Sequence, residues 1–158
     1  MAIEHVVASK SGVLVAWNSV SLGYTRDGVR IRIEPRWGDI QSDDFGGEGG
    51  APADTQLLGA IATITCEFTK YDAGEVRKLT SFEKAGLAGT LPSLGTLIRQ
   101  DTEFASLTLT GSIETWTFST AFPHESHELN KGTKFTTYTL GFEAWINNTT
   151  SRELFSVA

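Results

Sequence analysis

Strict alternation of apolar and polar residues, clearest between residues 29 and 34, constrains the fold of this chain most. The apolar positions are Val29, Ile31 and Ile33, and the polar positions between or after them are Arg30, Arg32 and Glu34. Successive side chains of a β-strand point to opposite faces, so the pattern predicts a strand with one buried and one charged face. Pro35 has no backbone N–H to donate, and we expect the strand to end there.

Two shorter runs precede this strand. Residues 12–17 (GVLVAW) predict a short strand, and residues 18–25 (NSVSLGYT) predict a turn into a second one. The pair Asp27-Gly28 is a strong hairpin signal, because glycine adopts the positive φ that a tight turn requires. We therefore expect three strands within the first 36 residues.

A glycine-rich acidic segment follows the alternating strand. Residues 37–55 (WGDIQSDDFGGEGGAPADT) contain five glycines and five acidic residues. Segments of this length and polarity are usually functional loops or disordered. We expect a long flexible loop at about residues 38–55.

Alternation returns in residues 57–71 and then gives way to a helical period. The apolar face of this second long strand comprises Ala62, Ile64, Cys66 and Phe68. Asp72 followed by Glu75 is typical of a capping box, and Val76, Leu79 and Phe82 follow at helical spacing. We expect one helix of about three to four turns that ends near Gly86.

The remaining periodic segments are also β-rich. Residues 104–118 and 133–147 are rich in Thr and aromatic residues, which favour a pleated and partly exposed surface. With the earlier elements they make six or seven strands and one helix. The chain is therefore predicted to be mainly β, a β-sandwich or barrel with one flanking α-helix. Its length predicts a single domain over residues 1–158.

Composition excludes some classes of function. Thirteen Lys and Arg against nineteen Asp and Glu give a net charge of -6, which disfavours a protein that grips a nucleic-acid backbone. The N-terminus has no basic region ahead of an apolar stretch, and no run reaches the roughly 20 apolar residues that span a bilayer. We expect a soluble chain made in the cytoplasm that binds no membrane, with its one cysteine, Cys66, buried in the core.

Reactive motifs are scarce. His124 to Glu128 (HESHE) could hold a metal, but a structural zinc site needs four converging ligands, so we interpret this segment as a solvated loop and predict no metal site. No nucleophile elbow, phosphate loop or dinucleotide fingerprint is present, so we predict no catalytic residue and no cofactor. Two alternatives stay open: glycoside chemistry at the loop carboxylates, and a sugar-binding platform built from Trp17, Trp37, Trp116 and Trp145.

Two stretches resemble the tail tube proteins of tailed bacteriophages. In the first, residues 22–35, the matching positions are Leu22, Gly23, Thr25, Gly28 and Val29. In the second, residues 49–72, they are Pro52, Asp54, Gly59, Glu67 and Phe68. The order and spacing agree over about the first 85 residues. The glycine-rich FGGEGG segment departs from the family pattern.

This resemblance implies a structural virion protein. It further implies that six copies form a ring whose inner strands join into a continuous β-barrel, and that the rings stack into a tube through which DNA passes. The implied partners are further copies of the chain and other tail proteins such as sheath, baseplate or terminator. The implied location is the virion tail, assembled in the bacterial host cytoplasm. A baseplate hub or a tail completion protein on the same fold is the alternative.

The resemblance and the charge pattern together single out candidate subunit contacts. Arginines on a strand of an acidic protein suit carboxylates of an adjacent subunit better than they suit DNA, although a solvated strand face would look the same. The predicted interface residues are Arg30, Arg32, Trp37, Asp43, Asp44, Phe45, Glu48 and Asp54.

Overall fold

The computed structural model describes residues 12–41, 49–79, 93–131, 136–146 and 153–158. Its strands, in chain order, are β1 (Leu14–Trp17), β2 (Val20–Ile40), β3 (Asp54–Tyr71), β4 (Ala105–Thr110), β5 (Thr115–Phe122), β6 (Glu128–Lys131), β7 (Thr136–Trp145) and β8 (Ser156–Val157). The helices are α1 (Ala73–Leu79) and α2 (Gln100–Glu103). No helix among these residues is long and apolar enough to span a membrane.

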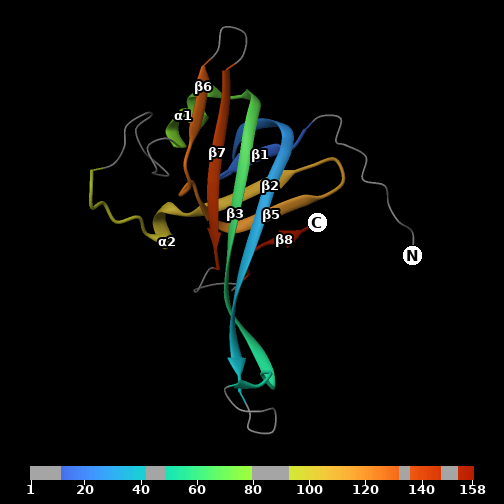
Figure 1. The fold of residues 1–158 in the computed structure, drawn as a ribbon. Coiled ribbons are helices and arrows are strands. Elements are labelled where there is room, and N and C mark those ends of the chain that lie inside the picture. Colours follow the sequence, from blue (N-terminus) through green and yellow to red (C-terminus); the bar gives the residue numbers. More distant parts are fainter. Residues whose placement is uncertain (1–11, 42–48, 80–92, 132–135, 147–152) are drawn as a thin grey trace.

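The strands form one antiparallel sheet that closes on itself. Their order is β6-β7-β3-β2-β1-β4-β5-β8, and β5 also pairs with β7 through Ala121↔Ala144 and Phe122↔Glu143. This last pairing closes β7, β3, β2, β1, β4 and β5 into a barrel, with β6 and β8 added outside the closed ring of strands (Figure 1). The mainly β architecture expected from the sequence is therefore confirmed.

The barrel encloses an aromatic and aliphatic core. Ile64, Cys66 and Phe68 from β3 are fully buried, as the alternation predicts, and they meet Phe142 from β7. Trp17 packs edge-on against Phe122, and its indole Nε1 donates a hydrogen bond of 3.0 Å to the carbonyl oxygen of Ala121. A buried indole N–H needs such a partner, so this bond fixes Trp17 across the barrel.

The helix predicted after Asp72 is present. The Asp72 Oδ1 accepts hydrogen bonds from the backbone N–H groups of Gly74 and Glu75 at 3.0 and 3.3 Å, which caps α1. Val76 and Leu79 are buried and attach α1 to the barrel. The predicted end of this helix near Gly86 lies outside the described residues. The short helix α2 was not expected from the sequence.

The hairpin predicted at Asp27-Gly28 is wrong, and so is the count of three strands in this region. Strand β2 runs through Gly28, with an irregular register between Thr25↔Phe68 and Val29↔Cys66 that leaves extra residues on β2. Gly28 does have a positive φ of 86°, but it serves a bulge and not a turn. The actual two-residue turn is Asn18-Ser19, between β1 and β2, with φ values of 55° and 63°.

The strand end predicted at Pro35 is also wrong. Pro35 pairs with Ala60, and β2 continues to Ile40 while β3 begins at Asp54. The predicted loop at residues 38–55 is therefore shorter, because its ends are paired strand. From Val29 onward β3 is the one strand paired with β2 among the described residues, and proline is tolerated on such an edge.

Further strands appear where the sequence suggested single segments or linkers. The β-rich segment 104–118 contains a turn, since Gly111 donates its N–H to the carbonyl oxygen of Glu114, and so it divides into β4 and β5. Strand β6 forms between the β-rich segments 104–118 and 133–147, and β8 pairs with β5.

Candidate assembly interface

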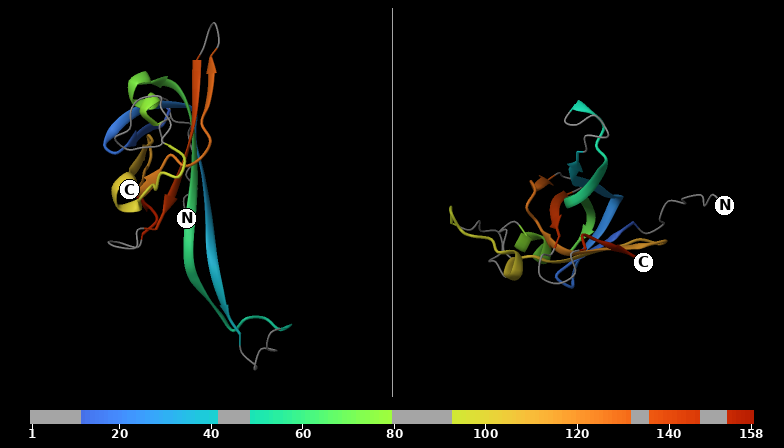
Figure 2. Two further views of the ribbon diagram at one scale, coloured as in Figure 1. Left: turned by 90° about the vertical axis from the view of Figure 1, so that its left-hand side faces the viewer. Right: turned by 90° about the horizontal axis from the view of Figure 1, so that it is seen from below.

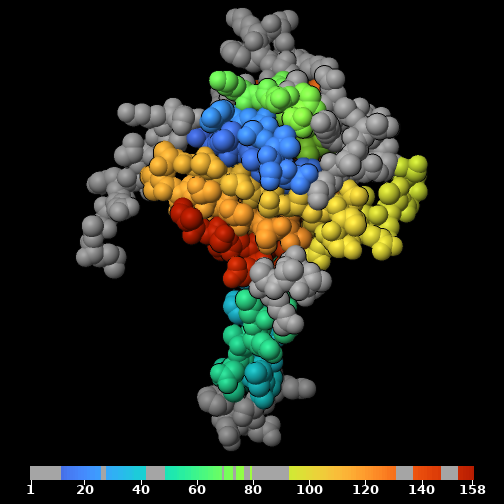
Figure 3. Space-filling model, turned by 180° about the vertical axis from the view of Figure 1, so that it is seen from behind, coloured from blue at the N-terminus to red at the C-terminus, as the bar shows by residue number. Residues whose placement is uncertain are grey.

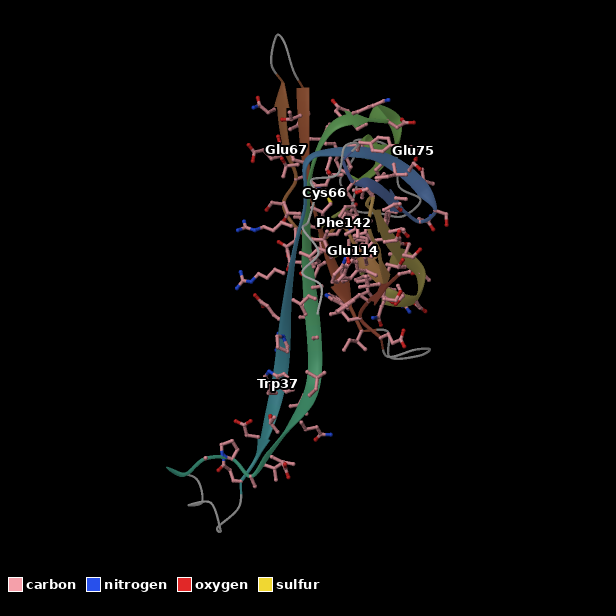
Figure 4. All side chains as sticks on the ribbon, turned by 90° about the vertical axis from the view of Figure 1, so that its right-hand side faces the viewer. Trp37, Cys66, Glu67, Glu75, Glu114 and Phe142 are labelled. Atoms are coloured by element: carbon pink, nitrogen blue, oxygen red, sulfur yellow. The ribbon has the colours of Figure 1, made fainter. Side chains whose placement is uncertain are left out.

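Four neighbouring strands, β6, β7, β3 and β2, turn one side away from the core (Figure 2). The register places polar side chains in rows across it, because paired residues share a face. We call this side the polar face; its residues are Arg30, Arg32, Thr63, Thr65, Glu67, Glu128, Asn130, Thr139 and Glu143. Figure 4 shows Glu67 on the side of β3 opposite the interior, where Cys66 and Phe142 lie.

The two arginines of the polar face are exposed. Arg32 Nε lies 2.9 Å from Glu34 Oε1, but the two side chains are 75% and 59% exposed, so this ion pair contributes little to stability. Arg30 has no ion-pair partner among the described residues. Both arginines line a shallow depression together with Thr63 and Thr65. They are available to a carboxylate from another chain.

Both sides of the polar face end in a strand with an open edge. Within the described part of the chain, β6 pairs with β7 alone, and β2 beyond Val29 pairs with β3 alone. An open edge presents unpaired N–H and C=O groups that readily pair with another strand. The two edges are therefore candidate contacts between chains.

Strands β2 and β3 continue past the barrel as a two-stranded arm, residues 34–40 and 54–60 (Figures 1 and 3). The arm carries large apolar side chains that nothing within the described residues covers. Their exposed fractions are 56% for Trp37, 51% for Ile40, 55% for Leu57 and 65% for Leu58. Trp37 lies far along the arm from the core (Figure 4). Clustered exposure of this kind marks an interaction surface.

The structure brings some predicted interface residues together and leaves others undescribed. Arg30 and Arg32 lie on the polar face, and Trp37 lies on the arm, where Asp54 pairs with Ile40. The other predicted residues lie outside the described part of the chain; they are Asp43, Asp44, Phe45 and Glu48. Sequence analysis missed Ile40, Leu57 and Leu58, although two adjacent leucines in a strand leave at least one on an outer face.

The geometry does not favour the sugar-binding alternative. Trp17 is buried in the barrel, Trp145 packs on Phe104 with ring centroids 4.7 Å apart, and Trp116 packs on Phe155 at 4.9 Å. Trp37 alone of the four tryptophans lies on the arm. A stacking platform needs several exposed rings on one face, and these rings do not share one.

Cys66 is fully buried, as predicted, and burial raises the pKa of its thiol to about 12. Its sulfur therefore stays protonated at neutral pH, and a protonated buried thiol is neither a nucleophile nor a metal ligand. The glycoside alternative depends on carboxylates at residues 43, 44 and 48, which lie outside the described residues, and on Asp54, which is exposed.

The HESHE segment is arranged differently from a solvated loop. His124 Nδ1 lies 3.3 Å from Glu143 Oε2, and His124, Glu125 and Glu143 offer ligand atoms within 4.8 Å of one another. His127 is partly buried, and that burial lowers its pKa, against a weaker opposing effect of a backbone hydrogen bond to Pro123. Sequence analysis missed Glu143, because it lies on β7 and no local motif connects it to the loop.

No protein-family model and no curated protein matches the chain. Solved structures do match in fold. A chain in the virion of a native gene transfer agent particle aligns with a TM-score of 0.50 and 16% identity, covering 84% of this chain and 89% of that one. A chain from an extracellular contractile injection system, in a structure of the PVC sheath/tube terminator in its extended state, aligns with a TM-score of 0.50 and 13% identity over 99% of both chains. The expected resemblance to tail-particle proteins is thus confirmed at the level of the fold.

Proposed function

We propose that this chain is a structural tail protein that assembles with copies of itself into hexameric rings, which stack into a tube for the passage of DNA. The polar face is the observation that carries the proposal. It is a four-stranded antiparallel sheet with an open strand edge on each side. The number six comes from the resemblance to tail tube proteins.

The strand directions suit a closed ring. Strands alternate in direction from β6 to β2, so β2 and β6 run in opposite directions. When β2 of one copy meets β6 of the next, related by rotation about an axis along the strands, the new pair is antiparallel as well. Repetition of this head-to-tail contact closes a ring and removes the open edges.

Charge complementarity supports the same contact. Arg30 and Arg32 lie on β2, and Glu128 lies on β6, all three on the polar face. The contact between β2 and β6 therefore brings arginines of one copy toward a glutamate of the next. Opposite charges on adjacent strands stabilise pairing by roughly 0.2–1 kcal/mol each. This is the contact to an adjacent subunit that the basic strand predicts.

The arm supplies a second contact. Trp37 and Leu57 are apolar and project beyond the barrel, so a neighbouring copy in the same or the next ring can bury them. We place the remaining predicted interface residues at this contact as well; they are Asp43, Asp44, Phe45, Glu48 and Asp54.

Ring closure through β2 and β6 also decides what lines the channel. The outer side of the closed barrel of strands faces other tail proteins such as sheath, and the polar face lines the lumen. Threonine and mixed charges in an acidic chain let DNA slide without a strong grip. The protein has a structural role in the virion and no enzymatic one.

Negative-stain microscopy over a range of protein concentrations tests the proposal. Stacked rings or tubes at high concentration are the expected result. Single rings that never stack would favour the alternative, a baseplate hub or a tail completion protein. Monomers at every concentration, with native circular dichroism, would overturn self-assembly altogether.

A further inference from the structure

A cluster of one imidazole and two carboxylates lies where the connection between β5 and β6 runs along the edge of β7 that both strands pair with. The members are His124 and Glu125 from the connection and Glu143 from β7. They are brought together from two separate parts of the chain, and their ligand atoms lie within 4.8 Å of one another. Glu143 belongs to the polar face, but the proposed contact between β2 and β6 uses none of the three residues.

The glutamate on β7 is held in place. Its Oε1 accepts a hydrogen bond of 2.6 Å from the indole Nε1 of Trp145, while its Oε2 faces His124 Nδ1 at 3.3 Å. The Glu143 side chain is only 15% exposed. Metal-binding carboxylates commonly have such an outer partner, which orients the free oxygen toward the ion.

The position of Glu125 is also built into the fold. It lies against β7 at Gly141, where an added Cβ would lie 2.3 Å from the Cβ of Glu125. Only a glycine on β7 allows this close approach. The ligand oxygens of Glu125 and Glu143 lie within 4.8 Å of each other. Two carboxylates this close favour a positive charge between them.

We propose that His124, Glu125 and Glu143 bind a divalent transition-metal ion such as Zn²⁺, with water as the fourth ligand of a tetrahedral ion. An imidazole nitrogen with carboxylate oxygens suits zinc, whereas calcium and magnesium prefer oxygen ligands alone. Ligands about 2.0–2.2 Å from a tetrahedral ion lie roughly 3.3–3.6 Å apart. The separation of 3.3 Å between His124 Nδ1 and Glu143 Oε2 already has this value, and a ligand atom of Glu125 lies within 4.8 Å of those of the other two residues. The ion would join the β5–β6 connection to β7 within a single chain, independently of assembly.

A zinc titration of the full-length untagged protein against a chromogenic chelator tests the site. One equivalent of Zn²⁺ is expected, with Ca²⁺ bound far more weakly. Glu143→Gln keeps the shape of the side chain and should weaken zinc binding at least tenfold, as should His124→Ala. Circular dichroism of each variant checks that the fold is intact.

Glu114→Gln is the matched control. Glu114 accepts a hydrogen bond from the indole of Trp116 two residues on, as Glu143 does from Trp145, but among the described residues it belongs to no such cluster. Its zinc affinity should equal that of the unaltered chain. Absence of stoichiometric zinc binding overturns the proposal. The proposal is also overturned if Glu143→Gln and His124→Ala leave the zinc affinity unchanged. The same holds if Glu114→Gln weakens zinc binding as much as they do.

Discussion

Trp37 of β2 is paired with Leu57 of β3, yet both side chains are more than half exposed. Paired residues share a face of the sheet, and nearer the barrel the same face of β3 carries the fully buried Ile64 and Cys66. The core-facing side of the sheet therefore continues outside the barrel, where none of the described residues covers it. A chain with such an arm has a surface suited to an apolar partner.

Replacement of Trp37 by Ala should impair assembly much more than folding. The side chain is 56% exposed, so we expect the free energy of unfolding to change by about 0.5 kcal/mol or less. A buried interface tryptophan often contributes about 2 kcal/mol or more, which corresponds to roughly a 30-fold higher concentration for half-assembly. Urea denaturation and sedimentation velocity measure the two quantities.

Ile113→Ala is the control for this arm variant, because Ile113 is 64% exposed but lies away from the arm, between β4 and β5. It should assemble at the concentration of the unaltered chain. If the Trp37→Ala variant also assembles at the concentration of the unaltered chain, the arm is not part of the interface.

A charge swap tests the contact between β2 and β6. Arg30→Glu should weaken assembly, since it places two glutamates opposite each other, and Glu128→Arg should weaken it by placing arginines together. The two changes combined restore opposite charges and should recover assembly. Light scattering at low and at high salt measures the extent of assembly of each variant. The loss of assembly in the single variants should be smaller at high salt, because salt screens exposed charges.

Arg99→Glu alters the net charge of the chain as Arg30→Glu does, but it lies beside α2 and not on the polar face. It should leave assembly unchanged. If the double variant stays as defective as the single ones, then Arg30 and Glu128 are not neighbours across the interface.

Much of the barrel is predictable from the sequence because its core strands obey local alternation. Ile64, Cys66 and Phe68 are buried as their spacing predicts, and the Asp72 cap forms as its motif predicts. The errors at Gly28 and Pro35 have another origin. Each residue has the backbone property that the sequence predicts: Gly28 has a positive φ, and Pro35 has no N–H donor. Whether such a residue ends a strand depends on how many neighbours that strand has, which is a long-range property.

The candidate sites likewise contain one part that local alternation predicts and another that depends on long-range strand pairing. Alternation alone places Arg30 and Arg32 on a charged face. The relation of that face to Glu128, and of His124 to Glu143, follows from strand order and register, which join residues far apart in the sequence. No local pattern in a single sequence carries this information.

Three glycine-to-alanine changes should alter the stability of the fold by graded amounts. At Gly59 an added Cβ meets nothing within 4 Å, and we expect little change or a gain of up to about 1 kcal/mol. At Gly28 space is also open, but φ is 86°, which costs about 1–2 kcal/mol for alanine. At Gly23 φ is 151° and the Cβ would lie 2.3 Å from the carbonyl oxygen of Lys70, so the loss should be largest.

Urea unfolding of the three variants under one buffer condition measures this series. The order Gly23→Ala, Gly28→Ala, Gly59→Ala, from least to most stable, is the expected result. A Gly28→Ala variant as stable as Gly59→Ala would mean that the bulge in β2 does not require a positive φ.

Alkaline pH should destabilise the protein through Cys66. Burial raises the pKa of this thiol from 9.0 to about 12, so between these values the unfolded chain loses a proton that the native chain keeps. The native state then binds more protons than the unfolded state, and stability falls as pH rises, while below about pH 9 this contribution is fully present. The slope approaches about 1.4 kcal/mol per pH unit.

Cys66→Ala isolates this effect, because it removes the thiol and leaves every tyrosine and lysine that also titrates in this range. The variant should be less stable than the unaltered chain at pH 8, since it leaves a small cavity in the core. The difference in the free energy of unfolding between the unaltered chain and the variant should narrow by about 1–2 kcal/mol when urea denaturation is repeated at pH 10. A difference that stays constant from pH 8 to pH 10 would mean that the thiol ionises equally in both states, and that Cys66 is less well sealed from water than its position in the barrel indicates.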